Sequence, residues 1–255
     1  MDCTSLLALF DEVATAIRGE LDRLADWGRA DGHEGQYVHD VVADDVAVPM
    51  LVDAGLGVIS EESGEHRVDR DIVVVVDPID GSTNASLGLP WFATSLAAVD
   101  RQGVVAALVV NPAIGVRYTA ARGQGAWRDG AAIPPSAFER LGDAIVAVNK
   151  LPPPICAQPF RVYGAAALDL CAVADGTFDG FVDCGVGLAP WDYLGALLVC
   201  TEAGAAVGEL ADRPLEVIEA PNRRSVVAAG TAAVRDQLRA VVSAPQPVSP
   251  AAVDG

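Results

Sequence analysis

The sequence is poor in basic side chains. Its 255 residues include 17 Lys and Arg against 35 Asp and Glu, which gives a formal net charge of −18, and its one lysine is Lys150. A protein that binds a nucleic-acid polymer neutralises phosphates with clustered Lys and Arg. The composition therefore argues against a nucleic-acid partner, and the acidic surplus favours cations as ligands.

Long apolar runs and paired cysteine motifs are also missing. No run approaches the roughly 20 apolar residues that a membrane span needs, and the chain does not open on a basic segment followed by an apolar one. The five cysteines form no C-x-x-C pattern and have no histidine at zinc-finger spacing, so we expect reduced thiols packed in a core. These absences predict a cytoplasmic protein that has no membrane partner and no structural zinc site.

The pattern that is present is that of a globular protein with helices and strands. Hydrophobic residues make up 51% of the chain and charged residues 20%, which excludes disorder and suffices for one large core or two small ones. Apolar residues three and four apart predict a helix over 6–24, before a glycine-rich loop over 28–35. A second helix is predicted over 41–56, bent or capped by Pro49. Apolar runs and close turns predict strands at 58–59, 72–76, 94–99, 104–110, 116–120 and 125–128, the last four as an antiparallel meander.

The second half of the chain reads as alternating strands and helices. We predict a strand at 144–148, a proline-rich break at 151–154, a helix at 165–175, a strand at 180–182 and a helix at 191–203 that Gly204 caps. On this basis the chain divides into an N-terminal α+β half, 1–140, a C-terminal α/β half, 141–242, and a proline-rich tail, 243–255, which is predicted to be disordered.

Three acidic motifs stand at the predicted ends of these elements. Asp77-Pro-Ile-Asp-Gly-Ser-Thr-Asn84 follows the valine strand, Ser60-Glu-Glu-Ser63 follows the strand before it, and Trp191-Asp192 opens the last predicted helix. Taken singly, each motif is ordinary turn or helix-start chemistry. A carboxylate at the end of a fully buried strand, however, needs a cation, and the hydroxyls and amides that follow Gly81 suit a phosphate group.

The three motifs together predict a magnesium site. The donor set consists of oxygen alone, without His or Cys, which favours Mg²⁺ over Zn²⁺. Two or three such ions held by shared carboxylates are a standard apparatus for the hydrolysis of phosphate esters. The sequence therefore predicts a Mg²⁺-dependent phosphatase that acts on a small phosphate monoester.

In this order the motifs resemble the inositol monophosphatase family of Mg²⁺-dependent, lithium-sensitive phosphatases. The resemblance rests on Ile59-Ser-Glu-Glu-Ser63, on Asp77 to Asn84, and on Trp191-Asp192 with Glu202-Ala-Gly204, and weaker similarity runs from about residue 37 to 230. It implies an α+β fold, the layered αβαβα sugar-phosphatase architecture, with the site between the two halves of the chain. It also implies a homodimer.

The resemblance implies a role for each metal ligand. Glu61, Asp77 and the backbone carbonyl of Ile79 correspond to ligands of a first Mg²⁺, which activates the attacking water. Asp77, Asp80 and Asp192 correspond to ligands of a second Mg²⁺, which stabilises the leaving alkoxide. Glu61 also corresponds to a ligand of a third, weaker ion.

The same resemblance implies which groups handle water and substrate. Ser82 corresponds to the hydroxyl that orients the attacking water, and Asp45 to the acid that pairs with this hydroxyl, with Asp44 as the alternative register. Glu61, Ser82 and Asp45 are thus the implied catalytic residues. The residues implied to bind substrate are Asp80, Gly81, Ser82, Gly164, Ala165, Ala166, Asp183 and Asp192.

Departures from the family pattern fall outside the implied metal ligands, so we expect catalysis to be intact. They face the alcohol half of the substrate and leave its identity open. The segment His39-Asp-Val-Val-Ala43 lacks the usual Val-Thr, Pro49 replaces a Glu, and Ala165 lacks the hydroxyl of a Thr. The loop from Asp183 to Trp191 is about two residues longer than in the inositol enzymes. His39 belongs either to this altered pocket or to a surface or structural position.

Several functional alternatives stay open at this point. A cyclitol or sugar monophosphate, of the inositol-phosphate kind, is the first choice of substrate; histidinol phosphate, fructose 1,6-bisphosphate, adenosine 3′,5′-bisphosphate and a biosynthetic-pathway intermediate are the alternatives. Basic residues are sparse between Trp127 and Asp192, which disfavours a second phosphate. A different enzyme class, the aspartyl-phosphate phosphatases, also has a nucleophilic Asp at the end of a buried strand. These enzymes need a second acid two residues later, and this sequence has Ile79 there, which argues against that class. A catalytically silent Mg²⁺-binding or assembly protein is the non-enzymatic alternative.

Overall fold

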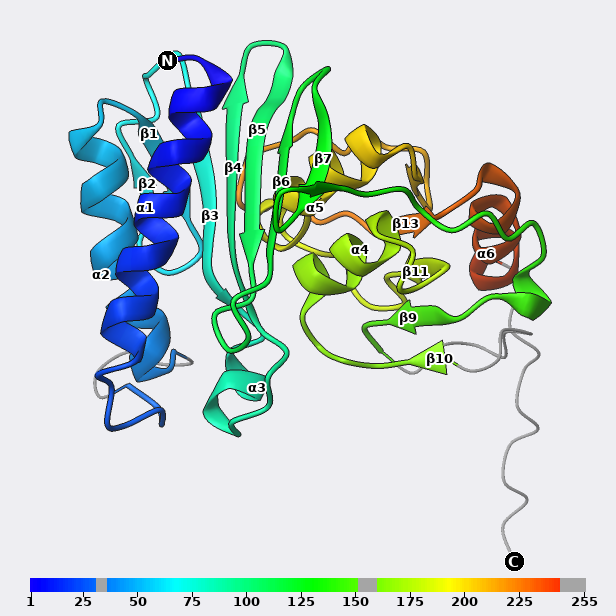
Figure 1. The fold of residues 1–255 in the computed structure, drawn as a ribbon, viewed down its shortest axis with the longest axis horizontal. Helices are drawn as coiled ribbons and strands as arrows, with labels where there is room; N and C mark the ends of the chain where they lie inside the picture. Colours follow the sequence, from blue (N-terminus) through cyan, green and yellow to red (C-terminus); the bar gives the residue numbers. More distant parts are fainter. Residues whose placement is uncertain (31–35, 151–159, 244–255) are drawn as a thin grey trace, which may run out of the picture.

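The chain folds into five alternating layers of helix and sheet. The computed structural model describes residues 1–30, 36–150 and 160–243. From left to right in Figure 1 the layers are α1 with α2, an eight-stranded sheet, α4 with α5, a five-stranded sheet, and α6. This is the layered αβαβα architecture of the α+β class, so the predicted fold class is confirmed.

The outer helical layer consists of α1 (Cys3–Leu21) and α2 (Val38–Asp53). The apolar stripe that predicted α1 is its buried face, and the carboxylate of Asp2 begins the helix by accepting a hydrogen bond from the Ser5 amide at 2.8 Å. The second helix begins three residues earlier than the apolar pattern predicted, and Pro49 lies inside its C-terminal part rather than at its end. This earlier start decides which acidic residue of α2 lies at the site.

The eight-stranded sheet has the order β2-β1-β3-β4-β5-β6-β7-β8. Only β1 and β3 run parallel among these neighbours, and the predicted antiparallel meander from β4 onward is confirmed. The strands are β1 (Gly57–Ser60), β2 (Gly64–His66), β3 (Val73–Asp80), β4 (Ala93–Asp100), β5 (Gly103–Val110), β6 (Arg117–Ala121), β7 (Gly125–Arg128) and β8 (Ala131–Ala132). A short helix, α3 (Ser82–Ser86), connects β3 to β4.

Strand β3 lies between two hydrophobic cores because side chains alternate across a sheet. Val74 and Val76 pack in the core formed with α1 and α2. Val73 and Val75 pack in the core formed with α4 and α5. All eight residues of β3 are buried, including the acidic residues at its end.

The central helices α4 (Ala166–Ala174) and α5 (Pro190–Ala203) separate the two sheets. The second sheet has the order β10-β9-β11-β13-β12. Its strands are β9 (Val146–Val148), β10 (Phe160–Arg161), β11 (Gly180–Val182), β12 (Ala206–Glu209) and β13 (Val226–Ala229), and a single 3-10 turn, Leu141–Asp143, precedes β9. Helix α6 (Ala232–Ser243) covers the outer face of this sheet with Val234 and Leu238.

The two predicted halves correspond to the two sheets but share one hydrophobic core. Helix α5 belongs to the C-terminal half by sequence, yet its buried residues join the core beneath β4 and β5. The sequence did not predict β2, β8, β10, β12, β13 or α6. The proline-rich break at 151–154, Cys156, part of the predicted loop at 28–35 and all but the first residue of the tail lie outside the described residues.

The structure also bears on the cysteines and on membrane-spanning helices. Within the described part of the chain, Cys3, Cys171, Cys184 and Cys200 are free thiols, two of them fully buried. None of the helices in this described part has the length and apolarity required to cross a membrane.

The close approach of α5 to the first sheet requires a glycine. A Cβ added to Gly195 lies 2.8 Å from the Ser95 Oγ and 3.3 Å from a Val109 methyl, whereas a Cβ added to Gly19 in α1 meets nothing within 4 Å. Gly195→Ala is therefore expected to lower the free energy of unfolding by about 1–3 kcal/mol through overpacking. Gly19→Ala, the matched helical control, is expected to raise it by about 0.5–1 kcal/mol. Urea unfolding measures both, and equal effects of the two substitutions would contradict the close approach.

Candidate metal centre

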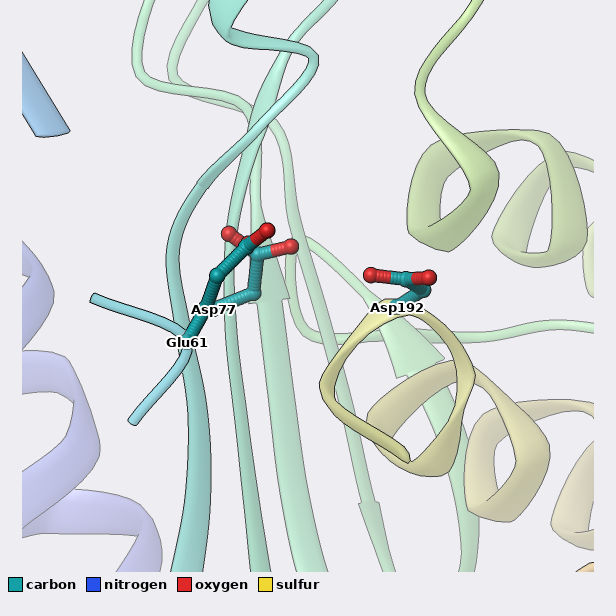
Figure 2. Close-up of side chains that lie close together, drawn as sticks. All are labelled: Glu61, Asp77 and Asp192. Atoms are coloured by element: carbon teal, nitrogen blue, oxygen red, sulfur yellow. The ribbon is translucent and has the colours of Figure 1, made fainter. Parts of the chain in front are cut away.

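Three carboxylates from separate parts of the chain meet between the first sheet and α5. One oxygen each of Glu61, Asp77 and Asp192 lies within 4.8 Å of the other two. Figure 2 shows the Glu61 and Asp77 side chains together, with the Asp192 carboxylate facing them from the N-terminal end of α5. The three acidic motifs of the sequence therefore do converge in space.

The parallel pairing of β1 with β3 places Glu61 beside Asp77. In this register Ser60 is opposite Val76, and the Glu61 amide donates a hydrogen bond to the Val76 carbonyl at 3.1 Å. Glu61 follows Ser60 and Asp77 follows Val76, so the two acids lie side by side at the same edge of the sheet. The short β-branched runs that form the two strands thus fix the spacing of two carboxylates.

Asp80 stands next to these three carboxylates but is not one of them. The register of β3 against β4 shifts between Asp77 and Asp80, so β3 bulges there. The regular alternation of side chains between the two faces of the sheet is therefore interrupted between these two acids. One oxygen of Asp80 accepts a hydrogen bond from the Ala167 amide at 2.7 Å, in the first turn of α4. Asp80 therefore connects the end of β3 to the start of the central helical layer.

Asp192 is held by the start of α5. Its Oδ2 accepts a hydrogen bond from the Ala189 amide at 2.7 Å, and Pro190 occupies the first helical position, where no amide donor is needed. The N-termini of α4 and α5 both lie against acids of the site, so two helix dipoles direct partial positive charge toward it. This arrangement favours anions, either the carboxylates themselves or a bound phosphate.

The crowding of acids raises their pKa values. Burial, with the nearby Glu61 and Asp80 carboxylates, raises the pKa of Asp77 well above its usual range. Desolvation, with the charges of Asp192 and Glu62, raises the pKa of Glu61 to about 8, and burial raises the pKa of Asp192 to about 6. Burial and the Asp192 charge likewise raise the pKa of Asp80. Each shift has the sign expected for carboxylates that lack a cation.

A divalent cation fits this donor set. The Oδ1 of Asp77 is buried and has no hydrogen-bond partner among the described residues, which is costly for a polar atom unless a ligand satisfies it. All the converging donors are carboxylate oxygens, and no thiol or imidazole is among them. Oxygen-only sites select hard ions such as Mg²⁺.

The segment after Asp80 packs against the implied substrate loop. Gly81 has a φ of 91°, a left-handed conformation that favours glycine, and it is the residue before α3. A Cβ added to Gly81 lies 3.1 Å from the Ala165 Cβ and 3.2 Å from the Gly164 carbonyl oxygen. The Ser82 hydroxyl donates a hydrogen bond to the Ile79 carbonyl at 2.9 Å. The structure thus brings these motif residues together, and Ala166 follows directly at the start of α4.

The acid that faces Ser82 is Asp40, and the expectation of Asp45 was wrong. Asp45 is exposed on α2, and Asp44 is buried elsewhere, where it accepts a hydrogen bond from the Ser60 hydroxyl. The Ser82 hydroxyl interacts with the Asp40 carboxylate and lowers its pKa, against the stronger raising effect of burial. Five residues separate Asp40 from Asp45, which is about 7.5 Å along a helix, so one acid cannot replace the other.

Asp40 was missed because α2 carries four acids, three of them in its first half, and its start was placed too late. The Tyr37 amide donates to the Asp40 carboxylate at 3.0 Å, a contact typical of an acid in the first turn. The signal available in the sequence was the spacing of Tyr37 and Asp40, an aromatic residue followed three positions later by an acid.

A second residue that the sequence analysis missed is Asn84. Its Nδ2 donates hydrogen bonds to the carbonyls of Trp91 and Tyr163, and so connects the segment before β4 to the segment before α4.

Asp183 is buried at the end of β11, on the side of the second sheet. One of its oxygens accepts hydrogen bonds from the Asn149 side chain and from the Gly185 amide, and the other is buried without a partner among the described residues. Its charge raises the pKa of Asp192, which places the two acids near each other. Asp183 therefore borders the site on the side opposite α2.

Comparison with known proteins agrees with the motifs. The model of the inositol monophosphatase family matches residues 52–244. The chain is 38% identical to the Nus factor SuhB of Escherichia coli (strain K12) over 170 residues, which is 60% of this chain and 62% of SuhB. The match therefore spans less than two thirds of that relative. The inositol-1-monophosphatase of Mesorhizobium japonicum is 34% identical over 230 residues, 81% of this chain and 83% of that protein.

The fold is also that of solved structures. A hypothetical protein from Pyrococcus horikoshii, described as similar to inositol-1 monophosphatase, superposes with a TM-score of 0.81. The sequences are 24% identical, and the superposition covers 92% of this chain and 98% of the other. This likeness concerns the arrangement of layers and strands.

The raised pKa values predict how Mg²⁺ affects stability. The folded, metal-free chain holds protons on these acids that the unfolded chain releases at a lower pH, so its free energy of unfolding falls as pH rises from about 4 to about 8. Mg²⁺ binds the deprotonated carboxylates and offsets this loss. The rise in Tm on adding Mg²⁺ to the EDTA-treated protein should therefore be larger near pH 8 than near pH 6. Scanning calorimetry that found equal rises would contradict the site.

Proposed function

The chain belongs to the inositol monophosphatase family, and on this premise we propose that it is a Mg²⁺-dependent phosphoric monoester hydrolase acting on a small cyclitol or sugar monophosphate. The observation that carries the proposal is the convergence of the Glu61, Asp77 and Asp192 carboxylates. Asp77 is the buried member, and its Oδ1 has no hydrogen-bond partner among the described residues. Oxygen donors at this spacing suit Mg²⁺, and the neighbouring helix N-termini suit a phosphate.

We assign the metal ligands as follows. Glu61, Asp77 and the Ile79 carbonyl would hold one ion, and Asp77, Asp80 and Asp192 a second, with Glu61 also near a third. When bound, such ions lower the pKa of a coordinated water and take up charge from the leaving oxygen. The chain's own contribution is to hold these oxygens at a fixed spacing on the ends of rigid strands and a helix.

The residues around the metal ligands would orient the reactants. The amides of Gly81 and Ser82 would hold phosphate oxygens at the start of α3. The Ser82 hydroxyl would orient the attacking water, and the Asp40 carboxylate beside it would accept the proton that this hydroxyl passes on. Attack by water in line with the leaving alcohol requires no covalent intermediate.

The alcohol half of the substrate would lie between the Gly164–Ala166 loop and Asp183. The loop presents no side-chain hydroxyl or charge, which suits a neutral cyclitol or sugar ring. A bisphosphate is the second candidate, because Arg223 lies 5.7 Å from the Trp191 ring centroid and its charge lowers the pKa of Asp192. The count of basic residues between Trp127 and Asp192 overlooked this arginine, which comes from the loop before β13.

We also propose that the protein is a homodimer in the cytoplasm, with a small phosphate ester rather than a nucleic-acid polymer or a membrane as its partner. The support is the family resemblance for the dimer, and the acidic composition for the partner. Light scattering coupled to size-exclusion chromatography tests the dimer directly.

Asp77→Asn and Asp192→Asn are expected to lower Mg²⁺-dependent phosphate release at least a hundredfold, because each removes a charged ligand. Both should keep or raise the Tm of the metal-free protein, since each relieves repulsion among buried acids. Malachite-green detection of phosphate over a broad panel of metabolite mono- and bisphosphates measures the activity, with Li⁺ inhibition on the best substrate. Glu65→Gln, an exposed acid on β2, is the control and should change neither quantity. No turnover by the unsubstituted protein on any ester would favour the non-enzymatic alternative.

Asp40→Asn is expected to lower kcat about a hundredfold with little change in KM, because Asp40 faces the hydroxyl that orients water and not the alcohol of the substrate. Asp45→Asn, on the same helix but exposed, should keep wild-type kcat. Steady-state kinetics on the best substrate compares the pair. A loss confined to the Asp45 variant would restore the register first expected from the sequence.

A further inference from the structure

His39 is a fully buried histidine with no role in the chemistry described so far. Its ring lies between the rings of Trp27 and Tyr37, with centroids 5.1 Å away on each side. The side chain is 0% exposed, and neither ring nitrogen makes a hydrogen bond of normal geometry with any described residue. The Oδ1 of Asp40 is unsatisfied in the same way. Three unsatisfied buried atoms thus belong to two adjacent side chains.

The groups that face the ring of His39 are hydrogen-bond acceptors. Its Nε2 lies 3.3 Å from the Asp40 Oδ1. Burial lowers the pKa of His39, while the Asp40 charge and the backbone carbonyls of Ser82 and Trp27 act against this lowering. A neutral imidazole donates from only one nitrogen, so its other nitrogen would face an acceptor without a proton. A ring with protons on both nitrogens satisfies the acceptors on both sides.

A purely structural role does not explain why this residue is a histidine. A phenylalanine has the same aromatic faces for Trp27 and Tyr37, and it has no ring nitrogen whose burial without a partner costs free energy. One of the two nitrogens that distinguish histidine from phenylalanine, Nε2, lies 3.3 Å from the Asp40 Oδ1. The proximity of Nε2 to Asp40 is therefore the property that a histidine supplies at this position and a phenylalanine does not.

Asp40 connects this contact to the reaction. One of its oxygens accepts the Tyr37 amide, the other faces His39, and the carboxylate interacts with the Ser82 hydroxyl. Burial raises the pKa of Asp40, which opposes the ionised form that can accept a proton from Ser82. A donor or positive charge next to Asp40 counters this effect.

Among the described residues, two further charges act on Asp40. Arg29, in the segment before α2, lies 4.0 Å above the Tyr37 ring and lowers the pKa of Asp40. Glu61, after β1, is a like charge that acts on Asp40 in the opposite sense. From α3 the ring meets Ser82, which is uncharged. The imidazole is the one of these groups that contacts the Asp40 carboxylate directly and can itself carry a proton.

We propose that His39 is a positioning residue, which donates a hydrogen bond from Nε2 to Asp40 and thereby keeps this carboxylate ionised and directed toward Ser82. The inference deepens the proposed function, because it rests on Asp40 accepting a proton through Ser82. It extends the chain of polar contacts from Ser82 through Asp40 to an imidazole that is shielded from solvent by two aromatic rings.

The kinetic test uses three substitutions that separate donor geometry from packing. The Nε2 of glutamine occupies about the place of the imidazole Nε2, and the amide of asparagine that of Nδ1. His39→Gln should therefore keep kcat at the optimum within about threefold, while His39→Asn should lose about tenfold. His39→Phe retains the ring packing but no donor, and should move the acidic limb of the kcat profile about one pH unit upward, because Asp40 then ionises less readily. KM should change little throughout.

His66→Gln is the matched control. The Nε2 of His66 lies 2.8 Å from the Ser63 hydroxyl at an exposed position, and its replacement should leave the kinetic profile unchanged. Superimposable pH profiles of His39→Phe and the unsubstituted protein would overturn the proposal. Equal losses in His39→Gln and His39→Asn would overturn it as well, since they would indicate a structural effect alone.

A second measurement does not depend on activity. Nitrogen-15 NMR of the histidine side chains in the Mg²⁺-loaded full chain gives the pKa of His39, assigned by the signals that His39→Gln removes. Asp40→Asn should lower this pKa by about one unit, because the charge that favours the imidazolium is lost, while the pKa of His66 should not move. An unchanged pKa of His39 would overturn the pairing. If the unsubstituted protein hydrolysed no ester, the proposed function would fail, and this NMR measurement would still decide whether His39 and Asp40 are coupled.

Discussion

The structure depends on the placement of like charges in a buried junction. Asp77 is almost fully buried in the second half of β3, a strand whose eight residues are all buried, and Glu61, Asp80 and Asp192 are its neighbours. Carboxylates this close repel one another and lose hydration, which destabilises the metal-free fold. The hydrophobic layers on both faces of β3 supply the opposing free energy. A fold with a smaller core would not retain four acids at this position without a cation.

Rigid elements hold these acids, and each one uses its backbone to do so. The parallel pairing of β1 with β3 sets the spacing of Glu61 and Asp77, the first turn of α5 fixes Asp192, and the start of α4 holds Asp80 through the Ala167 amide. Strand ends and helix starts vary less in position than loops, so the ligand geometry exists before a cation arrives. The β-bulge before Asp80 interrupts the alternation of side chains along β3, and the Asp80 carboxylate accepts its hydrogen bond from the first turn of α4.

The sequence predicted most of what strong local patterns determine. The meander predicted its four strands to within one residue at each end. The valine run predicted β3 but stopped four residues short of its end, and the apolar stripe predicted α1 three residues too late at both ends. The three acidic motifs contain the carboxylates that converge in space. The start of α2 was predicted wrongly because its apolar pattern is weak. Three of its four acids, those in its first half, are candidates for the same role, and only the contact of Asp40 with Ser82, 42 residues away in the sequence, selects among them. Strands β12 and β13 were missed because they are four residues long and are defined by pairing with each other and with β11. Such partners are not visible in a local window.

The site divides into two sides that come from different layers. Ser82 and Asp40, which we propose to orient the attacking water, and His39, which we propose to position Asp40, lie on the first sheet's side, at the start of α3 and α2. Asp183 and Arg223, which we propose to meet the alcohol, belong to segments of the second sheet. The three converging carboxylates come from both sides, so both must be in place for the cluster to form. The partners of His39 are Asp40, Ser82, Trp27 and Tyr37, whereas those of Asp183 are Asn149 and Gly185, so a change in the alcohol pocket need not disturb the orientation of the attacking water. The departures from the family pattern at Ala165 and in the loop after Asp183 are therefore compatible with an unchanged hydrolytic centre and an altered substrate.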